Sequence, residues 1–121
     1  MDQIVLNHVT KQFTTKTLGT VTAVNDFNLT IKEGECFSFL GPSGCGKTTT
    51  LRIVAGFYEP DAGDVFLGER RITSLPVHRR KTAMVFQDYA LFPHMNVGDN
   101  VGYGLRLAHV PGDTIRKRVQ E

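Results

Sequence analysis

The stretch GPSGCGKTTTLRIVAG, residues 41–56, constrains the fold of this chain more than any other part of it. Its first eight residues match the pattern G-x-x-x-x-G-K-[ST], which is typical of a loop that binds a nucleoside triphosphate. The apolar run CFSFL at 36–40 predicts a short buried parallel strand before the loop. After the loop we expect a helix from Lys47 to about Gly56, with an apolar face formed by Leu51, Val54 and Ala55. This order of strand, loop and helix is the context that separates a functional match from a chance one.

The residue types in the loop suit phosphate binding. Main-chain N–H groups can wrap closely round phosphate oxygens only where side chains are small, and Gly41, Gly44 and Gly46 meet that need. The start of the helix adds about half a positive charge at the same place. Lys47 is expected to neutralise the β- and γ-phosphates, and the Thr48 hydroxyl to bind Mg²⁺. The candidate nucleotide-binding residues of the loop are Gly41, Ser43, Gly44, Cys45, Gly46, Lys47, Thr48 and Thr49.

Several other segments have the patterns of strands. Phe27, Leu29 and Ile31 alternate with polar residues, which is the period of a half-buried strand. The polar stretch before them predicts a hairpin connection to an earlier strand at 4–13. Further strands are expected within 59–72 and, as a buried strand, at 82–87.

Two helices are predicted near the end of the sequence. The first has Asn96 as its N-cap and an apolar face of Val97, Val101 and Leu105. The glycines within it weaken that prediction, because glycine is a poor helix former; they are Gly98, Gly102 and Gly104. The second is expected to be capped by Asp113, with Ile115 and Val119 on one face.

Composition excludes several classes of protein. A net charge of +2 gives no electrostatic preference for nucleic acid, and the arginine clusters, Arg79-Arg80 among them, are interpreted as solvated faces. The sequence begins without a signal peptide and has no apolar run near the roughly 20 residues that cross a bilayer. Two cysteines without metal-ligand spacing fit a reducing compartment. We therefore expect a cytoplasmic chain that reaches a membrane only through a partner.

The motif alone is shared by GTPases, nucleotide kinases, helicases and transport ATPases, but the N-K-x-D motif of GTPases is absent. The runs LGPSGCGKTTTLRIVAGFYEPDAGDVFLGERRI and RRKTAMVFQDYALFPHMNVGDNVGYGL closely resemble the ATP-binding subunits of ABC transporters. The resemblance is greatest to bacterial importers of polyamines, ferric iron, sulfate and sugars, and extends from about Ile4 to the end of the chain. It implies an α/β fold of the P-loop NTPase type with an N-terminal antiparallel sheet, and ATP and Mg²⁺ as ligands.

The resemblance also implies roles for particular residues. Phe13 matches the aromatic residue that stacks on adenine, although it could instead belong to the core of the first hairpin. Gln87 matches the Q-loop glutamine, which binds Mg²⁺ and orients the attacking water; otherwise it simply ends a strand. Lys47 and Gln87 are thus the candidate catalytic residues. The apolar segment Tyr89–Met95 corresponds to the surface that meets the permease, and some of its side chains are expected to be core.

Other family motifs are absent, namely the L-S-G-G-Q signature, Walker B, the D-loop and the switch histidine. Asp88 does not replace the Walker B acid, because Gln87 occupies the position where that acid should fall. We interpret residues 1–121 as the N-terminal part of one nucleotide-binding domain, inactive in hydrolysis by itself. The full-length subunit would act as a homodimer on the cytoplasmic face of the membrane. The alternatives are a cytosolic ABC-type ATPase without a transport role and a nucleotide-binding module without turnover. The transported solute is not encoded in these residues.

Overall fold

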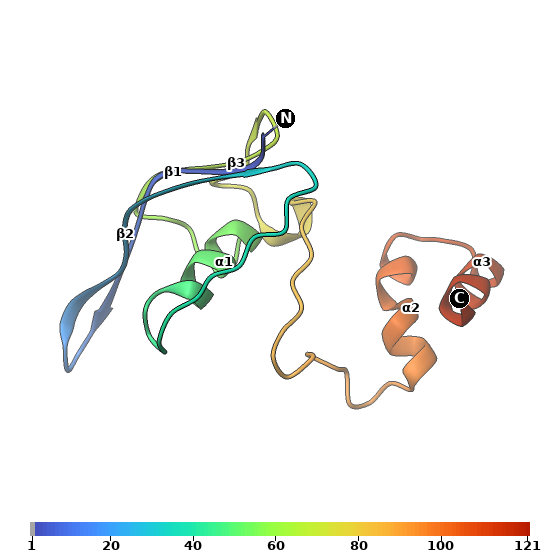
Figure 1. Ribbon diagram of the computed structural model, residues 1–121. Coiled ribbons are helices and arrows are strands. Elements are labelled where there is room, and N and C mark those ends of the chain that lie inside the picture. Colours follow the sequence, from blue (N-terminus) through green and yellow to red (C-terminus); the bar gives the residue numbers. More distant parts are fainter. Residues whose placement is uncertain (1) are drawn as a thin grey trace. The chain divides into compact units, whose positions relative to one another are not determined.

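The computed structural model describes residues 2–121, which form two compact units, one up to Met84 and one from Val85 onward (Figure 1). The first unit holds the strands and the glycine-rich loop 41–46, and the second holds two helices. The strands are β1 (Asp2–Thr15), β2 (Gly19–Lys32), β3 (Ala62–Leu67) and β4 (Arg70–Arg71). The helices are α1 (Lys47–Ala55), the short 3-10 helix η1 (Val77–Arg79), α2 (Val97–Leu107) and α3 (Gly112–Gln120).

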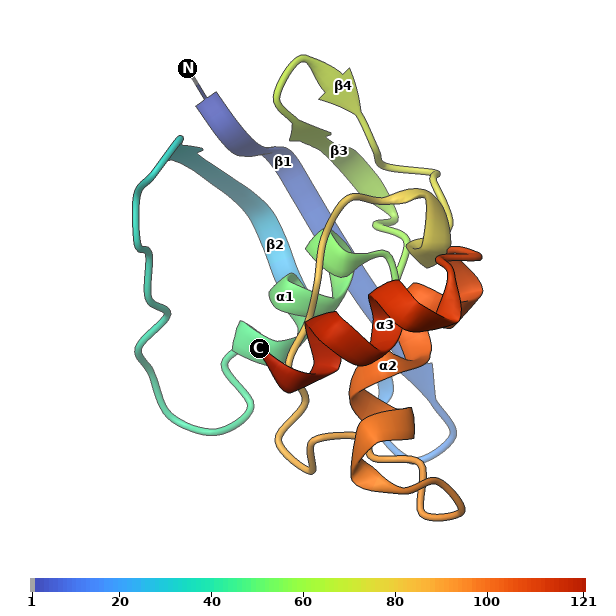
Figure 2. The same ribbon diagram turned by 90° about the vertical axis from the view of Figure 1, so that its right-hand side faces the viewer.

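The sheet of the first unit is antiparallel, with the strand order β2-β1-β3-β4 (Figure 2). β1 and β2 form a long hairpin, as the sequence predicts. Phe27, Leu29 and Ile31 are half-buried and their polar neighbours are exposed, so the predicted alternation is confirmed. The expectation of an antiparallel N-terminal sheet is correct.

A bulge bends the hairpin about halfway along its length. His8 in β1 and Asp26 in β2 both have left-handed backbones, with φ of 51° and 46°, and the pairing shifts register beside each of them. The next strand adapts with Gly63, where a Cβ atom would lie 2.2 Å from the His8 carbonyl oxygen. Only glycine can come this close to the bulge. Beyond the bend, the hairpin tip extends away from the other strands (Figure 1).

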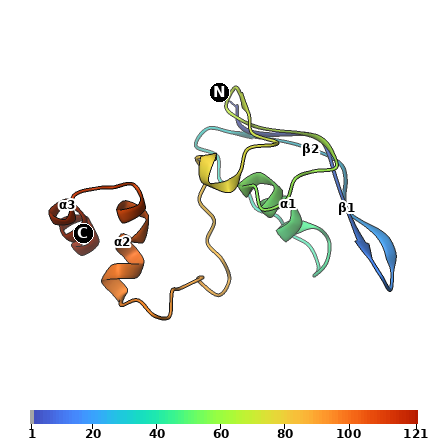
Figure 3. The same ribbon diagram turned by 180° about the vertical axis from the view of Figure 1, so that it is seen from behind.

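Helix α1 lies against one face of the sheet, and the core is formed between them (Figures 1 and 3). The buried apolar residues come from three strands, the helix and the segment after β4; they are Leu6, Val9, Val24, Ile53, Val65 and Ile72. The face that α1 buries differs in part from the prediction: Ala55 is buried and Val54 packs against the core, as expected, but Leu51 is exposed while Thr50 and Ile53 are buried. The sheet meets α1 on the side of Ile53, and Leu51 is 48 % exposed.

Two predicted buried strands are wrong. Residues 36–40 and 82–87 pair with no other strand of residues 2–121, and neither segment belongs to a helix or strand. Leu40 is 95 % exposed and Val85 is 87 % exposed. A parallel strand forms only when neighbouring strands satisfy its N–H and C=O groups. Residues 2–121 supply no such neighbours, so apolar composition alone does not produce a ladder here.

The second unit consists of α2 and α3 packed side by side (Figures 2 and 3). Asn96 caps α2 as predicted, because its side-chain oxygen accepts a hydrogen bond from the Asp99 N–H at 2.8 Å. The predicted cap of α3 is wrong: Pro111 is the N-cap, and Asp113 lies in the first turn.

A glycine of α2 makes this packing possible. A Cβ atom at Gly102 would lie 3.0 Å from Ile115 and 3.3 Å from Val119, the two apolar residues predicted for one face of α3. A side chain at this position would crowd both residues, which would have to shift by a few tenths of an ångström. Gly102 therefore costs helix propensity but lets the two backbones approach.

Candidate nucleotide-binding site

The loop before α1 has a backbone that depends on its glycines. Gly44 and Gly46 have φ of 81° and 94°, values that other residues seldom adopt. A Cβ atom at Gly46 would also lie 2.5 Å from the carbonyl oxygen of Ala23 in β2. At Gly41 it would lie 2.7 Å from the Cys45 sulfur. All three glycines therefore permit either a backbone turn or a close approach, as predicted.

The N-terminus of α1 is available to an anion. Gly46 is the N-cap and has no side chain to bond the first N–H groups, and the first turn contains no acidic residue. The Thr50 hydroxyl donates to the Gly46 carbonyl oxygen at 2.9 Å, so it does not occupy these donors either. The unpaired N–H groups and the helix dipole together favour a negatively charged ligand here.

Lys47 places its ammonium group at the mouth of this loop. Its Nζ donates to the carbonyl oxygens of Gly41 at 2.5 Å and Pro42 at 2.7 Å, and lies 3.4 Å from the Cys45 sulfur. A hollow of about 220 Å³ between β2 and the loop is lined by Lys47, Gly46 and Cys45 together with residues of β2 and of 39–40. The structure thus brings the loop, the helix terminus and the lysine to one place.

The remaining polar side chains of the motif have different surroundings. Ser43 and Thr48 are exposed, and Thr49 is half-buried. An exposed Thr48 hydroxyl in the first turn of α1 is accessible to a hydrated cation. Neutral hydroxyl oxygen suits Mg²⁺, which prefers oxygen ligands and keeps several waters.

Phe13 lies near the end of β1, in contact with the chain that follows α1. Its ring meets that of Tyr58 edge to face, with centroids 5.2 Å apart and an interplanar angle of 71°. The Lys11 ammonium lies 5.4 Å from the Phe13 centroid. Tyr58 is in turn fixed by Arg52 of α1, whose Nη1 donates to the tyrosine hydroxyl at 3.0 Å. Phe13 is half-buried in this group, which orients its ring while leaving part of it accessible.

Asp61 ties the hairpin to the chain after α1. Its carboxylate accepts from the Gln12 N–H at 2.6 Å and from Lys11 Nζ at 3.3 Å. The bond from Gln12, with Lys11 adding to it, lowers the pKa of Asp61 below its ordinary value. A lowered pKa means that the carboxylate contributes its full stabilisation above the ordinary pKa of an aspartate. That contribution is lost as the pH falls through the lowered value.

Gln87 begins a turn of the second unit that ends at Ala90, and its side chain is exposed. Tyr89 and Ala90 follow with φ of 60° and 49°, so two successive residues other than glycine have left-handed backbones. Such strain is typical of functional loops. Tyr89 is 74 % exposed and Leu91 67 % exposed, whereas the Phe92 ring packs on Tyr103 with centroids 4.6 Å apart. The segment Tyr89–Met95 therefore contains outward-facing apolar residues and one ring, that of Phe92, which is 37 % exposed but rests on α2.

One important residue is missed by sequence reasoning. Arg80 was expected on a solvated face but is only 7 % exposed. Its guanidinium donates to four carbonyl oxygens at 2.7–3.0 Å, those of Ile53, Val54, Thr73 and Leu75. Ile53 and Val54 lie in the last turn of α1, where carbonyls lack i+4 partners; the Ile53 oxygen also accepts a bond from the C-cap Gly56 N–H at 3.2 Å. Its neighbour Arg79 is exposed, as expected. No local sequence signal distinguishes the two arginines.

Known proteins that are similar to this chain share one family. The profile of the family described as "ABC transporter" matches residues 24–121. The chain belongs to the ABC transporter family. Among its relatives are the spermidine/putrescine import ATP-binding protein PotA of Rubrobacter xylanophilus, 55 % identical over 96 % of this chain, and the Fe(3+) ions import ATP-binding protein FbpC of Escherichia coli, 47 % identical over 96 % of this chain. The chain spans 29 % and 32 % of the lengths of these two proteins.

Solved structures agree with the assignment to the ABC family. The dimeric, post-hydrolysis structure of the ATP-binding cassette MJ0796 with ADP and Pi covers 97 % of this chain at 32 % identity, with a TM-score of 0.86. This chain covers 54 % of that cassette. The ABC ATPase fold expected from the sequence is thereby confirmed.

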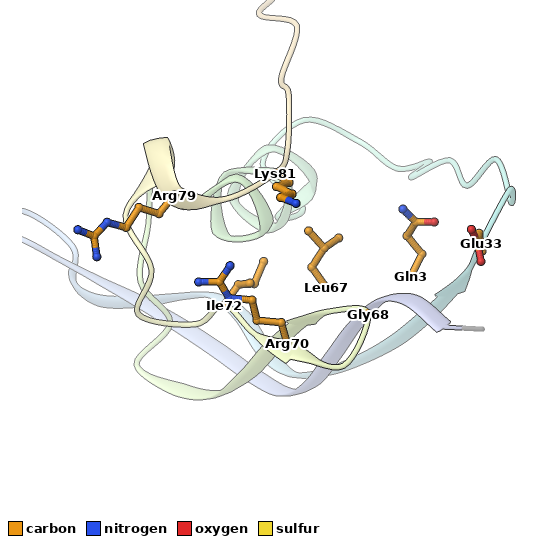
Figure 4. A pocket seen from close by; sticks show the side chains of 8 residues that line it. All are labelled: Gln3, Glu33, Leu67, Gly68, Arg70, Ile72, Arg79 and Lys81. Atoms are coloured by element: carbon orange, nitrogen blue, oxygen red, sulfur yellow. The ribbon is translucent and has the colours of Figure 1, made fainter. Parts of the chain in front are cut away.

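A second hollow of the ABC chain, of about 370 Å³, lies in the first unit (Figure 4). Arg70, Arg79 and Lys81 are basic residues around it, and Glu33 lies at its far side. None of its lining residues belongs to the loop 41–46 or to α1. It has neither the glycine-rich backbone nor a helix N-terminus, so the loop with Lys47 remains the better phosphate site.

Within residues 2–121, no cluster of three or more His, Cys, Asp or Glu side chains could hold a metal ion. The helices described here are too short or too polar for any of them to span a bilayer.

Proposed function

We propose that this chain binds MgATP at the loop 41–46 and, as part of a complete ABC subunit, hydrolyses it to drive import of a small solute. The observation that carries the proposal is the convergence of Lys47, the glycine loop and the uncapped N-terminus of α1. The relatives are named as import ATP-binding proteins, for polyamines and for ferric ions. Both names agree with this activity, and they differ in the solute.

In the proposed complex, Lys47 exchanges the carbonyl oxygens of Gly41 and Pro42 for the β- and γ-phosphate oxygens. The main-chain N–H groups of the loop and of the first turn of α1 bind the remaining phosphate oxygens, with Thr49 near the α-phosphate. Thr48 would hold Mg²⁺ through its neutral hydroxyl oxygen, and the ion would neutralise charge on the phosphates. The resemblance gives the amide oxygen of Gln87 the same role in the complete subunit. Gln87 would also orient the attacking water. Its amide does not take up a proton, so it is no general base.

We further propose that residues 1–121 form part of a single nucleotide-binding domain. It would dimerise with a second ATPase subunit and dock on the cytoplasmic side of a permease through Tyr89–Met95. The exposure of Tyr89 and Leu91 supports the docking segment. A cytosolic ABC-type ATPase without a permease is the alternative, and it has no use for an apolar surface at this segment.

The adenine contact is tested by replacing Phe13 with Ala. Loss of one base–aromatic stack costs about 1–3 kcal/mol, so the dissociation constant of MgATP is expected to rise about 5- to 150-fold. The affinity for inorganic tripolyphosphate should change little, because that ligand has no base. Calorimetric titration of both ligands measures the difference. Phe57→Ala, which removes a more exposed ring just after α1, is the control. Equal losses for both ligands would place Phe13 in the core.

The docking segment is tested in the full-length subunit by replacing Leu91 with Asp. A carboxylate at a buried apolar contact is left without a partner, so co-purification with the membrane subunits and solute uptake are expected to fall at least about tenfold. Leu107→Asp is a matched control, because Leu107 is 64 % exposed in the same unit but lies outside the segment. Uptake that survives Leu91→Asp would show that the permease binds elsewhere.

A further inference from the structure

The side chain of Asn100, in the first turns of α2, is bonded almost entirely to the loop that precedes the helix. Its Oδ1 accepts from the Phe92 N–H at 2.8 Å. Its Nδ2 donates to the carbonyl oxygens of Phe92 at 3.2 Å, Met95 at 3.1 Å and Asn96 at 3.0 Å. An amide has two N–H bonds, so one of these three contacts shares a hydrogen. A single side chain thus bonds both ends of the loop 92–95.

A second contact holds the same loop against the same helix. Tyr103 lies one turn after Asn100 on α2, and its ring packs on that of Phe92. Residues three apart in a helix share a face, so the Asn100 amide and the Tyr103 ring contact the loop from the same side of α2. With Phe92 held from this side, Tyr89 and Leu91 remain exposed.

Asn100 does not hold the helix pair together. Asn96 already caps α2, through a bond from the Asp99 N–H to its own side chain. The contact between α2 and α3 involves a different residue of α2: Ile115 and Val119 of α3 lie next to Gly102. The amide of Asn100 therefore determines the shape of the loop and leaves both helices to other interactions.

We propose that Asn100 is a positioning residue for coupling: it holds the loop 92–95 in the conformation that presents Leu91 and Tyr89 to the permease. The inference rests on the docking segment proposed above. A loop that is fixed before docking does not lose conformational entropy on binding, so fixing it strengthens the complex. Releasing the loop should weaken docking even though no docking side chain is changed.

Three variants test this in the full-length subunit. Asn100→Asp keeps an acceptor but cannot donate, so it sets a carboxylate against three carbonyl oxygens. Asn100→Ala removes the bonds altogether and has a higher helix propensity, so α2 is retained. Asn96→Asp is the matched control: it makes the same change of amide to carboxylate four residues earlier, but its role as acceptor at the N-cap is preserved.

The first readout is amide hydrogen exchange. Exchange at Phe92 and Met95 is expected to become at least about tenfold faster in both Asn100 variants, while amides of α3 keep their rates. Asn96→Asp should leave all of these rates unchanged. If the loop amides keep their protection in Asn100→Ala, or if α3 loses protection together with the loop, the proposal is wrong.

The second readout is the amount of solute taken up per ATP hydrolysed, in vesicles that contain the subunit and its permease. Both Asn100 variants are expected to lower this ratio several-fold, and Asn96→Asp to retain it. A purely structural role would reduce uptake and hydrolysis together. If Leu91→Asp lowers the ratio and the Asn100 variants do not, the role of Asn100 is refuted while the docking segment stands. If Leu91→Asp has no effect either, the proposed docking segment itself is wrong.

Discussion

Replacing Lys47 with Ala is expected to raise the dissociation constant of MgATP about a hundredfold or more. Lys47 is the cation at the mouth of the loop, where its ammonium group now bonds two carbonyl oxygens. A hydrogen bond that involves a charged group contributes about 1.5–3 kcal/mol, and bonds to two phosphates would be lost together. The carbonyls of Gly41 and Pro42 belong to exposed residues and can bond water instead. The fold should therefore survive, as circular dichroism would show.

Lys81→Ala is the informative control for this experiment. Lys81 lines the other hollow of the first unit, beside Arg70 and Arg79. Its removal should leave MgATP affinity unchanged if the nucleotide binds at the loop. Equal losses in both variants would place the anion elsewhere. Phosphate release gives a second measurement: residues 1–121 alone are expected to show none above background. Release that Lys47→Ala abolishes would reveal a catalytic acid, with the exposed Asp88 as the first suspect.

The backbone of the loop 41–46 and the start of α1 could be predicted because their determinants are local. The positive φ of Gly44 and Gly46 and the start of α1 at Lys47 all follow from eight consecutive residues. The cap at Asn96 was predictable for the same reason, since a cap bonds an N–H three residues away. Where a structure depends on neighbours in the sequence, the pattern is sufficient.

Features that depend on distant partners were not predictable. The run 36–40 has the composition of a buried strand, but strand formation requires other strands beside it, and residues 2–121 do not provide them. Gly102 weakened the prediction of α2, because glycine is a poor helix former. Its contribution is to allow the close approach of α3, and no local pattern reveals that partner. Arg79 and Arg80 have the same sequence surroundings, but only Arg80 reaches the end of α1.

Arg80 gives the second large expected effect. Burial lowers the pKa of its guanidinium, which the negative charge of Glu59 partly opposes. The ion is stabilised by carbonyl dipoles, two of them at the C-terminal end of α1, where a helix favours positive charge. Gly56 leaves room for the arginine, because a Cβ atom there would lie 2.5 Å from Nε.

Arg80→Met, which keeps most of the side-chain length without the donors, is expected to lower the free energy of unfolding of the first unit by about 3–5 kcal/mol. The neutral side chain would leave up to three carbonyl groups without a donor in a site that admits little water, because Ile53 keeps its bond from the Gly56 N–H. Arg79→Met, next to it and exposed, should change stability by less than about 0.5 kcal/mol. Urea unfolding of both variants measures the contrast.

Arg80→Lys shows whether charge or geometry matters in this site. A lysine keeps the charge, but its donors radiate from one atom, whereas the guanidinium fork of Arg80 reaches α1 on one side and the segment 73–75 on the other. We therefore expect Arg80→Lys to lose more than half of the stability that Arg80→Met loses. Full stability in Arg80→Lys would mean that the charge at the end of α1 suffices. Because α1 carries Lys47 at its other end, a helix released at Gly56 should also bind MgATP more weakly.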